Sequence, residues 1–426
     1  MTLKNYIFKN LWLQVVISLI IGLSVGLFLG DDVGVGLEDD GLDFVTSYLS
    51  IPANIFLSLI HMIIVPLIFS SIVIAITSLG STDKLKTLGL GVGSYFVITT
   101  VIAILVAIFL VSIVSPGNLL DISLLQESYD LNDNDVKIKE GFALDDIPNA
   151  VSNIIPKNPI SSYLEGQMLS ILIFAMIIGM SMVILPKESV KPILDILESI
   201  QKITIHILMF SMKIVPFAVF GLIVGMVSKV GIGSMIGMGA YMGTVVLGLG
   251  IILLVYILIL KLVAKRSISS TFSKMRNPQS LAFSTGSSMA TMPVTLKTAE
   301  DDLKIDSRVS KFVIPFGTTV NMDGTALYQV MAVFFLAQLF SIELSPISIF
   351  VIIVTSLLAS IGTPAIPGAG VIVLSTILVT VGIPPIGIIL LISVDRILDM
   401  TRTMVNVTGD LTACCVFDKI TRNQKG

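Results

Sequence analysis

The sequence predicts an all-α polytopic membrane protein, and three observations lead to this prediction. First, 54% of the 426 residues are hydrophobic and only 13% are charged, whereas an average soluble domain is about 25% charged. Second, the mean hydropathy is +0.98. Third, apolar stretches long enough to cross a bilayer, about 20 residues each, recur along the chain. This composition excludes a soluble globular enzyme, a disordered protein and a nucleic-acid-binding protein.

The apolar stretches mark the expected membrane segments. The second and third are longer than a perpendicular crossing needs, so we expect tilt or extension beyond the bilayer. The first is long and lacks a small-residue cleavage site, so we expect a membrane helix there and not a cleaved signal peptide. The stretches are 10–30, 44–82, 87–120, 166–185, 203–228, 231–260, 312–341, 346–381 and 383–417.

The positions of lysine and arginine predict the orientation, because these residues concentrate on the cytoplasmic side. A consistent assignment places 19 of the 26 basic residues there, together with both chain termini. The loop 31–43 has six acids and no base, and the segment 121–165 is also acidic, so both are expected outside. The sequence therefore predicts a multi-pass protein of the cytoplasmic membrane.

Two segments cannot cross the membrane as ordinary helices: the Ser- and Thr-rich segment at about 268–296 and the interrupted apolar segment 346–381. The segments 261–276 and 297–311 both carry several bases and are expected in the cytoplasm, yet only a Ser- and Thr-rich stretch separates them. A re-entrant hairpin at about 268–296 resolves this conflict. The stretch 346–381 is interrupted by GTPAIPGAG (362–370) and predicts a second hairpin. Non-helical backbone is tolerated at membrane depth only beside protein or a wet cavity, so the hairpin tips indicate a site.

Each predicted hairpin is followed by a long helix, at about 308–341 and about 385–418. We expect polar segments at 321–325 and 402–410 to interrupt these helices and free backbone carbonyl groups. A hairpin and a broken helix, repeated in opposite orientation, is the inverted-repeat pattern of secondary transporters, whose site lies at the repeat interface. A helix bundle with polar kinks that serve only packing is the alternative.

Ionisable residues within membrane segments are usually functional. Asp399, Arg402, Asn406 and Asp410 have spacings of 3, 4 and 4, so they share one helical face. Arg402 can hold a carboxylate with its planar fork, and Asp399 can hold an ammonium group. Asp323 and Asp410 are hard oxygen ligands suited to Na⁺. A purely structural ion pair and a pair of helix caps remain alternatives for these residues.

Several long motifs resemble one family. TTVNMDGTALYQ (318–329), GTPAIPGAG (362–370) and DMTRTMVNVTGD (399–410) resemble segments of the dicarboxylate/amino acid:cation symporter family, which includes the glutamate transporters and archaeal aspartate transporters. HMIIVPLIFSSIV (61–73) and the segment 155–182 are also similar. The resemblance covers essentially the whole chain. It implies sodium-coupled symport of L-aspartate or L-glutamate, with Na⁺ as the coupling ion and no cofactor or enzymatic activity.

The resemblance also implies an architecture. This is the glutamate transporter fold, with eight transmembrane helices plus two re-entrant hairpins, assembled as a lipid-embedded homotrimer with an elevator mechanism. Its parts are scaffold helices one and two in 1–80, transport-domain helix three in 81–120, the extracellular loop 121–165, scaffold helices four and five in 166–228, and the remaining transport domain in 229–426.

The same resemblance implies the residues of the binding sites. Arg402 would take the side-chain carboxylate of the substrate and Asp399 its amino group. The substrate-binding set is Ser287, Ser288, Thr325, Ile366, Gly370, Asp399, Arg402, Thr403 and Asn406. Three Na⁺ sites would use, in turn, Gly317, Asn321, Asn406 and Asp410; Thr319, Met322, Ser360, Ile361 and Thr363; and Phe96, Thr99, Thr100, Asn321 and Asp323.

Several positions depart from the family pattern, and three of them bear on charge and ion coupling. Archaeal relatives have an arginine where this chain has Gly286, and animal relatives have one where it has Met400. Arg396 lies on the same face as Asp399, three residues earlier, and we expect it to balance charge instead. Gln329 stands where animal members have a glutamate linked to proton coupling. We therefore predict Na⁺ coupling without proton or K⁺ coupling.

Four other functions are weighed against this one. A proton-coupled C4-dicarboxylate symporter of the same family would bind a substrate with no ammonium group to place on Asp399. A proton-coupled glutamate symporter of the family would differ in its coupling ion. A neutral amino acid transporter would not need Arg402. An intramembrane aspartyl hydrolase would need Asp323 and Asp410 to share a proton. The presence of both Asp399 and Arg402 favours an acidic amino acid.

Overall fold

The computed structural model describes residues 11–30, 39–77, 83–120, 158–164, 168–230, 233–363 and 365–423. Within these ranges every regular element is a helix and no strand occurs, which confirms the predicted all-α class. The basic residues Lys4 and Lys9, most of the acidic loop 31–43 and residues 121–157 of the second acidic loop lie outside the described ranges.

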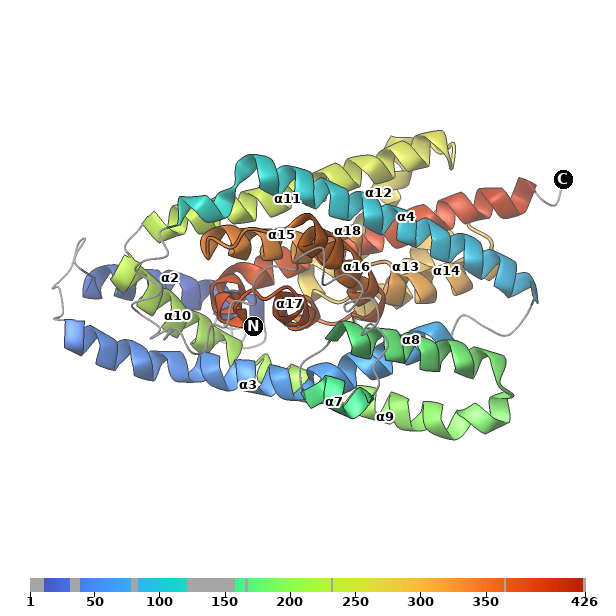
Figure 1. Cartoon of the computed structure of the whole chain (residues 1–426). Coiled ribbons are helices and arrows are strands. Elements are labelled where there is room, and N and C mark those ends of the chain that lie inside the picture. Colours follow the sequence, from blue (N-terminus) through green and yellow to red (C-terminus); the bar gives the residue numbers. More distant parts are fainter. Residues whose placement is uncertain are drawn as a thin grey trace, which may run out of the picture.

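One group of helices lies along one side of the molecule (Figure 1). Within it, α10 packs against α2 and α3, and α3 packs against α8 and α9. Small buried residues such as Ala53 and Ala218 allow the close approach of α3 and α10. The group comprises α2 (Leu11–Leu29), α3 (Asp39–Thr77), α7 (Pro159–Leu164), α8 (Met168–Ile184), α9 (Lys187–Ser211) and α10 (Val215–Val230).

The second group surrounds α18 (Ile388–Asn423), which packs against α11, α12, α14 and α15 (Figure 1). Helix α15 of this group is buried along almost its whole length. The other members are α4 (Asp83–Val114), η1 (Pro116–Leu119), α11 (Gly233–Leu262), α12 (Ile268–Thr285), α13 (Ser288–Lys297), η3 (Thr298–Asp302), α14 (Ser307–Val320), α15 (Asp323–Leu339), α16 (Pro346–Gly362), α17 (Ala369–Thr380) and η4 (Pro385–Gly387).

Three described segments are long and apolar enough to cross a membrane, namely Gly89–Leu119, Ile236–Leu262 and Ser307–Leu339. The pair α9 and α10 makes a fourth if it counts as one span, with a bend of 49° between the two helices. The predicted segment 203–228 covers the end of α9 and most of α10, with a break between the two helices. Pro216 gives the reason, since proline has no N–H to donate and fits the first turn of a new helix.

The polar segment 321–325 interrupts its helix as predicted, because Asn321 and Met322 separate α14 from α15. The expected interruption at 402–410 is wrong, since α18 continues without a break from Ile388 to Asn423. This helix contains no proline. The hydroxyl groups of Thr403 and Thr408 donate to the carbonyl groups one turn earlier, at 2.8 and 2.7 Å, and so the polar residues leave the helix closed.

Two helix pairs occupy the positions of the predicted hairpins. Gly286 and Ser287 join α12 to α13, and the segment 363–368 joins α16 to α17. The two tips touch, because the Ser287 hydroxyl donates to the carbonyl oxygen of Ala365 at 2.7 Å. The backbone N–H of Met289 donates to the same oxygen at 3.3 Å. The turns of both pairs therefore meet at one point above α18.

The base of the first helix pair is fixed to the end of α18 by Asp418. This carboxylate is 2% exposed and accepts from Arg266 Nη2 and Arg422 Nε, both at 3.1 Å. The backbone N–H of Asp306 donates to it at 3.0 Å. Arg266 precedes α12 and Asp306 follows η3, so both ends of the first pair are held at the same place.

Candidate functional site

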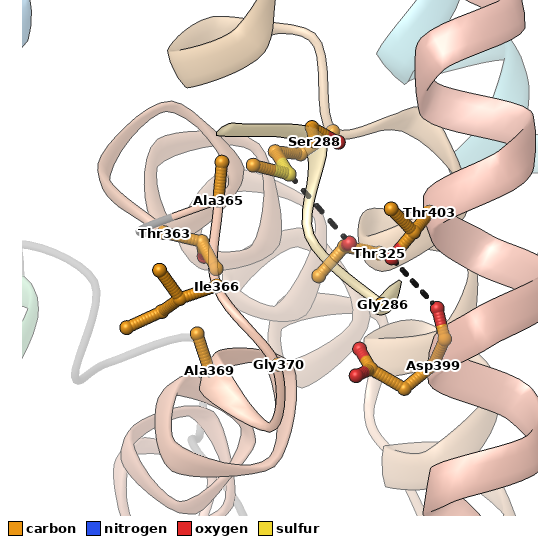
Figure 2. Close-up of a pocket in the computed structure, with 11 residues that line it drawn as sticks. Gly286, Ser288, Thr325, Thr363, Ala365, Ile366, Ala369, Gly370, Asp399 and Thr403 are labelled. Carbon is orange, nitrogen blue, oxygen red and sulfur yellow. Dashed lines mark hydrogen bonds between the residues drawn. The ribbon is translucent and has the colours of Figure 1, made fainter. Parts of the chain in front are cut away.

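A small cavity lies between the two tips and α18 (Figure 2). Its volume of ≈ 20 Å³ is enough for about one water molecule, so an amino acid requires the tips to move apart. Six of the predicted substrate-binding residues line it, and two of the predicted ion ligands do as well. The lining residues are Gly286, Ser288, Met322, Thr325, Thr363, Ala365, Ile366, Ala369, Gly370, Asp399 and Thr403.

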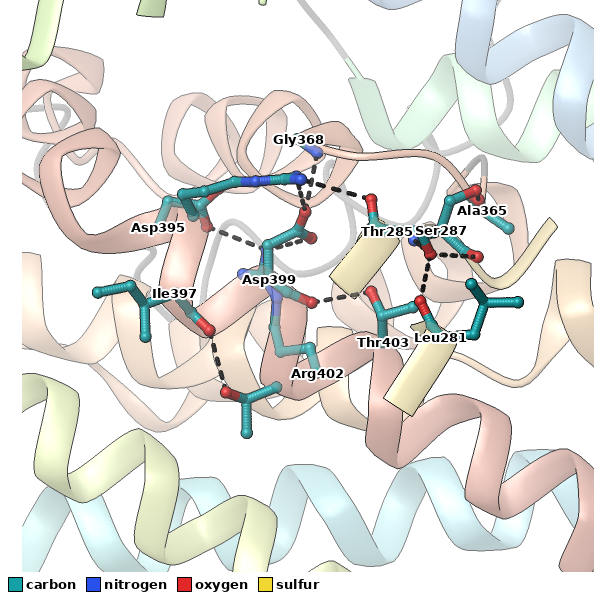
Figure 3. A network of polar contacts seen from close by, with 12 residues as sticks. Leu281, Thr285, Ser287, Ala365, Gly368, Asp395, Ile397, Asp399, Arg402 and Thr403 are labelled. Carbon is teal, nitrogen blue, oxygen red and sulfur yellow. Dashed lines mark hydrogen bonds and ion pairs between the residues drawn. The ribbon is translucent and has the colours of Figure 1, made fainter. Parts of the chain in front are cut away.

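Asp399 is the acidic group of this cavity, and both of its oxygens are occupied (Figure 3). Oδ1 accepts from Arg402 Nη2 at 2.8 Å. Oδ2 accepts from the backbone N–H of Gly368, at the second tip, at 3.2 Å, and from Arg396 Nη1 at 3.4 Å. Asp399 and Arg402 therefore form the ion pair that was the structural alternative for these residues, and the second tip is bonded to the same carboxylate.

Arg402 is 1% exposed and lies behind the cavity wall, next to Gly370. Its Nη2 also forms an ion pair with Asp395 at 3.0 Å, and its guanidinium carbon lies 3.7 Å from the centre of the Tyr328 ring. Such cation–π contacts stabilise a desolvated cation. In the described part of the chain, Nε and Nη1 of Arg402 have no hydrogen-bond partner. Two nitrogen atoms, with three N–H bonds between them, are thus left to donate to a carboxylate.

The sequence reasoning missed Asp395. This residue is 6% exposed and shares the charge of Arg402 with Asp399. Its position could have been found from spacing, because it lies four residues before Asp399 and seven before Arg402, on the same helical face.

Arg396 lies beside Asp399, as expected from its spacing, and it also contacts the first tip. Its Nη2 donates to the carbonyl oxygen of Thr285 at 3.4 Å. A Cβ atom on Gly286 would lie 2.9 Å from Arg396 Nη1, so a side chain there would displace the guanidinium. Gly286 also has φ +63°, a left-handed conformation that favours glycine. The side chain of Arg396 therefore occupies the space beside Gly286.

A second polar cluster surrounds Asp410, farther along the same helix. Asn321 Nδ2 donates to Asp410 Oδ1 at 2.9 Å and to the carbonyl oxygen of Asn406 at 3.0 Å. The backbone N–H of Gly324 donates to Asn406 Oδ1 at 2.8 Å. Asn321 Oδ1 is buried and has no hydrogen-bond partner within the described ranges. Gly317 faces Asp410 at close approach, so the structure brings together all four residues of the first predicted ion set.

A third cluster surrounds Asp323, which is fully buried. The hydroxyl groups of Thr100 and Tyr256 donate to its two oxygens, each at 2.6 Å. Thr99 donates to the carbonyl oxygen of Phe96 at 3.1 Å, one turn away on α4. Tyr256 was missed by the sequence reasoning, because nothing in its surrounding aliphatic segment points to a polar contact 67 residues away.

No basic side chain forms an ion pair with Asp323 or Asp410 in the part of the chain that the structure describes. Both side chains are nonetheless buried. A buried charge without a charged partner is strongly unfavourable. The two carboxylates therefore favour a site for a cation supplied from solution, and oxygen ligands are those that hard cations prefer.

The remaining predicted ion set is less closely assembled. Met322 and Thr363 line the cavity, and α14 packs against α16, which carries Ser360 and Ile361. The hydroxyl groups of Thr319, Ser360 and Thr363 donate to carbonyl groups of their own helices. Among the predicted substrate residues, Ser287, Arg402 and Asn406 do not line the cavity; Ser287 instead joins the two tips.

Comparisons with known proteins identify the family. The sequence model of the sodium:dicarboxylate symporter family matches residues 11–420. The chain belongs to this family. It is 33% identical over 400 residues to the proton/sodium-glutamate symport protein of Bacillus subtilis, covering 93% of this chain and 92% of the relative. It is 29% identical over 422 residues to the proton/glutamate-aspartate symporter of Escherichia coli, covering 98% and 94%.

A third relative of this symporter family is excitatory amino acid transporter 3 of Mus musculus, 29% identical over 468 residues, covering 98% of this chain and 87% of the relative. The resemblance found in the sequence motifs is therefore confirmed. The family and these relatives are transporters, and the apolar helices fit a multi-pass membrane protein.

Proposed function

We propose that this symporter couples the movement of Na⁺ to the uptake of an acidic amino acid, L-aspartate or L-glutamate, across the cytoplasmic membrane. The observation that carries the proposal is the buried Arg402, whose Nε and Nη1 groups lack a partner among the described residues, beside Asp399 at the cavity. The pair offers one cationic and one anionic group to a single ligand. That combination fits a substrate with both a carboxylate side chain and an ammonium group.

On binding, the substrate would replace one of the present hydrogen-bond partners of Asp399. The substrate's side-chain carboxylate would receive two N–H groups from Arg402, and its ammonium group would replace the Gly368 N–H at Asp399. Ser288 and Thr325 line the cavity and Asn406 donates to Thr325 at 3.3 Å, so these residues are suited to the α-carboxylate. Each charge-assisted hydrogen bond of this kind contributes about 1.5–3 kcal/mol.

Sodium ions would occupy the clusters around Asp323 and Asp410, with a third ion near Met322 and Thr363. Two buried carboxylates without a basic partner in the described ranges support this assignment. The end of α16 adds to it, since helix C-termini carry partial negative charge. Gln329 is buried beside Gly370, donating to its carbonyl oxygen at 3.4 Å, and a side-chain amide offers no proton to carry. This supports Na⁺ coupling without proton coupling.

The proposed architecture has eight membrane helices and two re-entrant hairpins in inverted repeats, with both termini cytoplasmic. The scaffold is 1–80 and 166–228, and the mobile transport domain is 81–120 and 229–426, moving as an elevator within a homotrimer. Two observations support this division. The helices form two groups (Figure 1), and every residue that lines the cavity belongs to the second group.

The test uses the purified full-length protein in proteoliposomes with radiolabelled substrate. An inward Na⁺ gradient is expected to drive L-aspartate or L-glutamate uptake, and a pH gradient alone is expected to drive none. Unlabelled succinate and L-serine serve as competitors. Uptake of L-aspartate or L-glutamate driven by a pH gradient without Na⁺ would instead support the proton-coupled glutamate symporter. Stronger competition by succinate than by L-aspartate would support the C4-dicarboxylate symporter.

A further inference from the structure

Tyr256 connects three helices at the Asp323 cluster. It lies on α11 and is fully buried, and its hydroxyl donates to Asp323 Oδ2 at 2.6 Å, at the start of α15. The same hydroxyl lies against the backbone of α18. A Cβ atom on Gly409 would come within 2.5 Å of Tyr256 Oη and 2.6 Å of Asn321 Nδ2, so only glycine leaves room for both groups.

The hydrogen bond from Tyr256 fixes one side of the carboxylate. Thr100 donates to Oδ1 and Tyr256 donates to Oδ2, so the plane of the carboxyl group is held from two helices at once. A carboxylate that is already oriented loses less freedom when it binds an ion, and sites whose supporting groups hold the ligands in place bind more tightly.

We propose that Tyr256 is a positioning residue for the coupling ion, holding the Asp323 carboxylate in the orientation that Na⁺ requires. This inference rests on the proposed function, because it assigns Na⁺ to the Asp323 cluster. Tyr256 itself would not contact the substrate or carry a charge. Removal of its hydroxyl should therefore weaken ion binding and, through linkage, the Na⁺-dependent binding of L-aspartate.

The test compares Tyr256→Phe with the wild-type protein. Phenylalanine keeps the ring and removes only the hydroxyl, so the packing volume is almost unchanged. The purified full-length protein is titrated with NaCl at constant ionic strength with choline chloride. The readouts are thermal unfolding without amino acid and binding of radiolabelled L-aspartate. We expect the Na⁺ midpoint to rise about tenfold in both, equivalent to about 1.4 kcal/mol, with full L-aspartate binding restored at saturating Na⁺.

Tyr95→Phe is the matched control. Tyr95 lies on α4 beside Phe96, and its buried hydroxyl has no hydrogen-bond partner within the described ranges. Its removal is expected to leave the Na⁺ midpoint unchanged. The control therefore reports the effect of deleting a tyrosine hydroxyl in this region without the contact to Asp323.

Two outcomes would overturn the inference and can be told apart. If the unfolding temperature of Tyr256→Phe falls equally at every Na⁺ concentration while the midpoint stays at the wild-type value, Tyr256 has only a structural role. If the wild-type protein itself shows no Na⁺-dependent stabilisation or L-aspartate binding, the proposed function fails, and this inference fails with it.

Discussion

Two regions of the second helix group, one around Asp399 and one around Asp323 and Asp410, differ in the partners of their acidic side chains. Around Asp399, carboxylates and guanidinium groups are neighbours, and Arg402 alone pairs with two acids. Around Asp323 and Asp410, the partners of the carboxylates are neutral hydroxyl and amide groups. Yet all four side chains, Asp399, Arg402, Asp323 and Asp410, are buried to a similar degree.

The difference indicates what each region's acidic side chains bind when no ligand is present. The first region balances its own charge, so its tips can meet over Asp399 with the Gly368 N–H in place. The second region has two buried carboxyl groups, Asp323 and Asp410, that form no ion pair with a basic side chain among the described residues. A substrate would therefore have to displace ion pairs and hydrogen bonds at Asp399, whereas a cation would meet carboxyl groups whose partners among the described residues are neutral. Three substitutions test this contrast.

Arg402→Ala is expected to have the largest effect, because it removes the cation that balances Asp395 and Asp399. Loss of two charge-assisted hydrogen bonds, at about 1.5 kcal/mol each, predicts about a 100-fold lower affinity for L-aspartate. The measurement is radioligand binding with the purified protein. Arg308→Ala is the control, because that side chain is 72% exposed. An affinity within threefold of wild type would show that Arg402 does not receive the substrate carboxylate.

Asp410→Asn is expected to have the next largest effect. Asparagine keeps an oxygen that accepts from Asn321 Nδ2 and removes only the charge. The Na⁺ midpoint should rise about tenfold, and the L-aspartate affinity at low Na⁺ should fall with it, because the two ligands are linked. The measurement is L-aspartate binding over a series of Na⁺ concentrations. Normal binding at low Na⁺ would contradict the assignment of an ion to Asp410.

Arg396→Ala should have the smallest effect of the three. Its contacts with Asp399 and Thr285, both 3.4 Å, are longer than those of Arg402 and are correspondingly weaker. We expect about a threefold to tenfold change in L-aspartate affinity or uptake rate, with Arg396→Lys closer to wild type because it retains the charge. If affinity and rate both stay at the wild-type values in proteoliposomes, the idea that Arg396 replaces the missing family arginine is wrong.

Much of the fold could be predicted from the sequence, because apolar length and charge placement locate helices without knowledge of contacts. The break at Asn321 and the two helix pairs at 268–297 and 346–380 followed from the same reasoning. The continuity of α18 did not. Polar residues signalled an interruption there, but their hydroxyl groups bond within the helix, and Arg402 forms its ion pairs with Asp395 and Asp399 of the same helix.

Much of the candidate site could be predicted as well, where it depends on residues of one helical face or one motif. Spacing brought Asp399, Arg402, Asn406 and Asp410 together, and Asp395 could have been added by the same rule. Tyr256 could not, because its contact with Asp323 depends on how α11 packs against α15. The partnering of Asp399 with the Gly368 N–H also depends on the closed arrangement of the tips.

The arrangement at Asp418 has a practical consequence for handling the chain. The last turns of α18 contact the ends of other helices, since Lys419 Nζ donates to the carbonyl oxygen of Val263 at 2.9 Å and Arg422 Nη2 to that of Lys304 at 2.7 Å. These residues therefore belong to the folded body. A purification tag or a fluorescent fusion partner belongs after Asn423, and a deletion that reaches Asp418 would release both ends of the first helix pair.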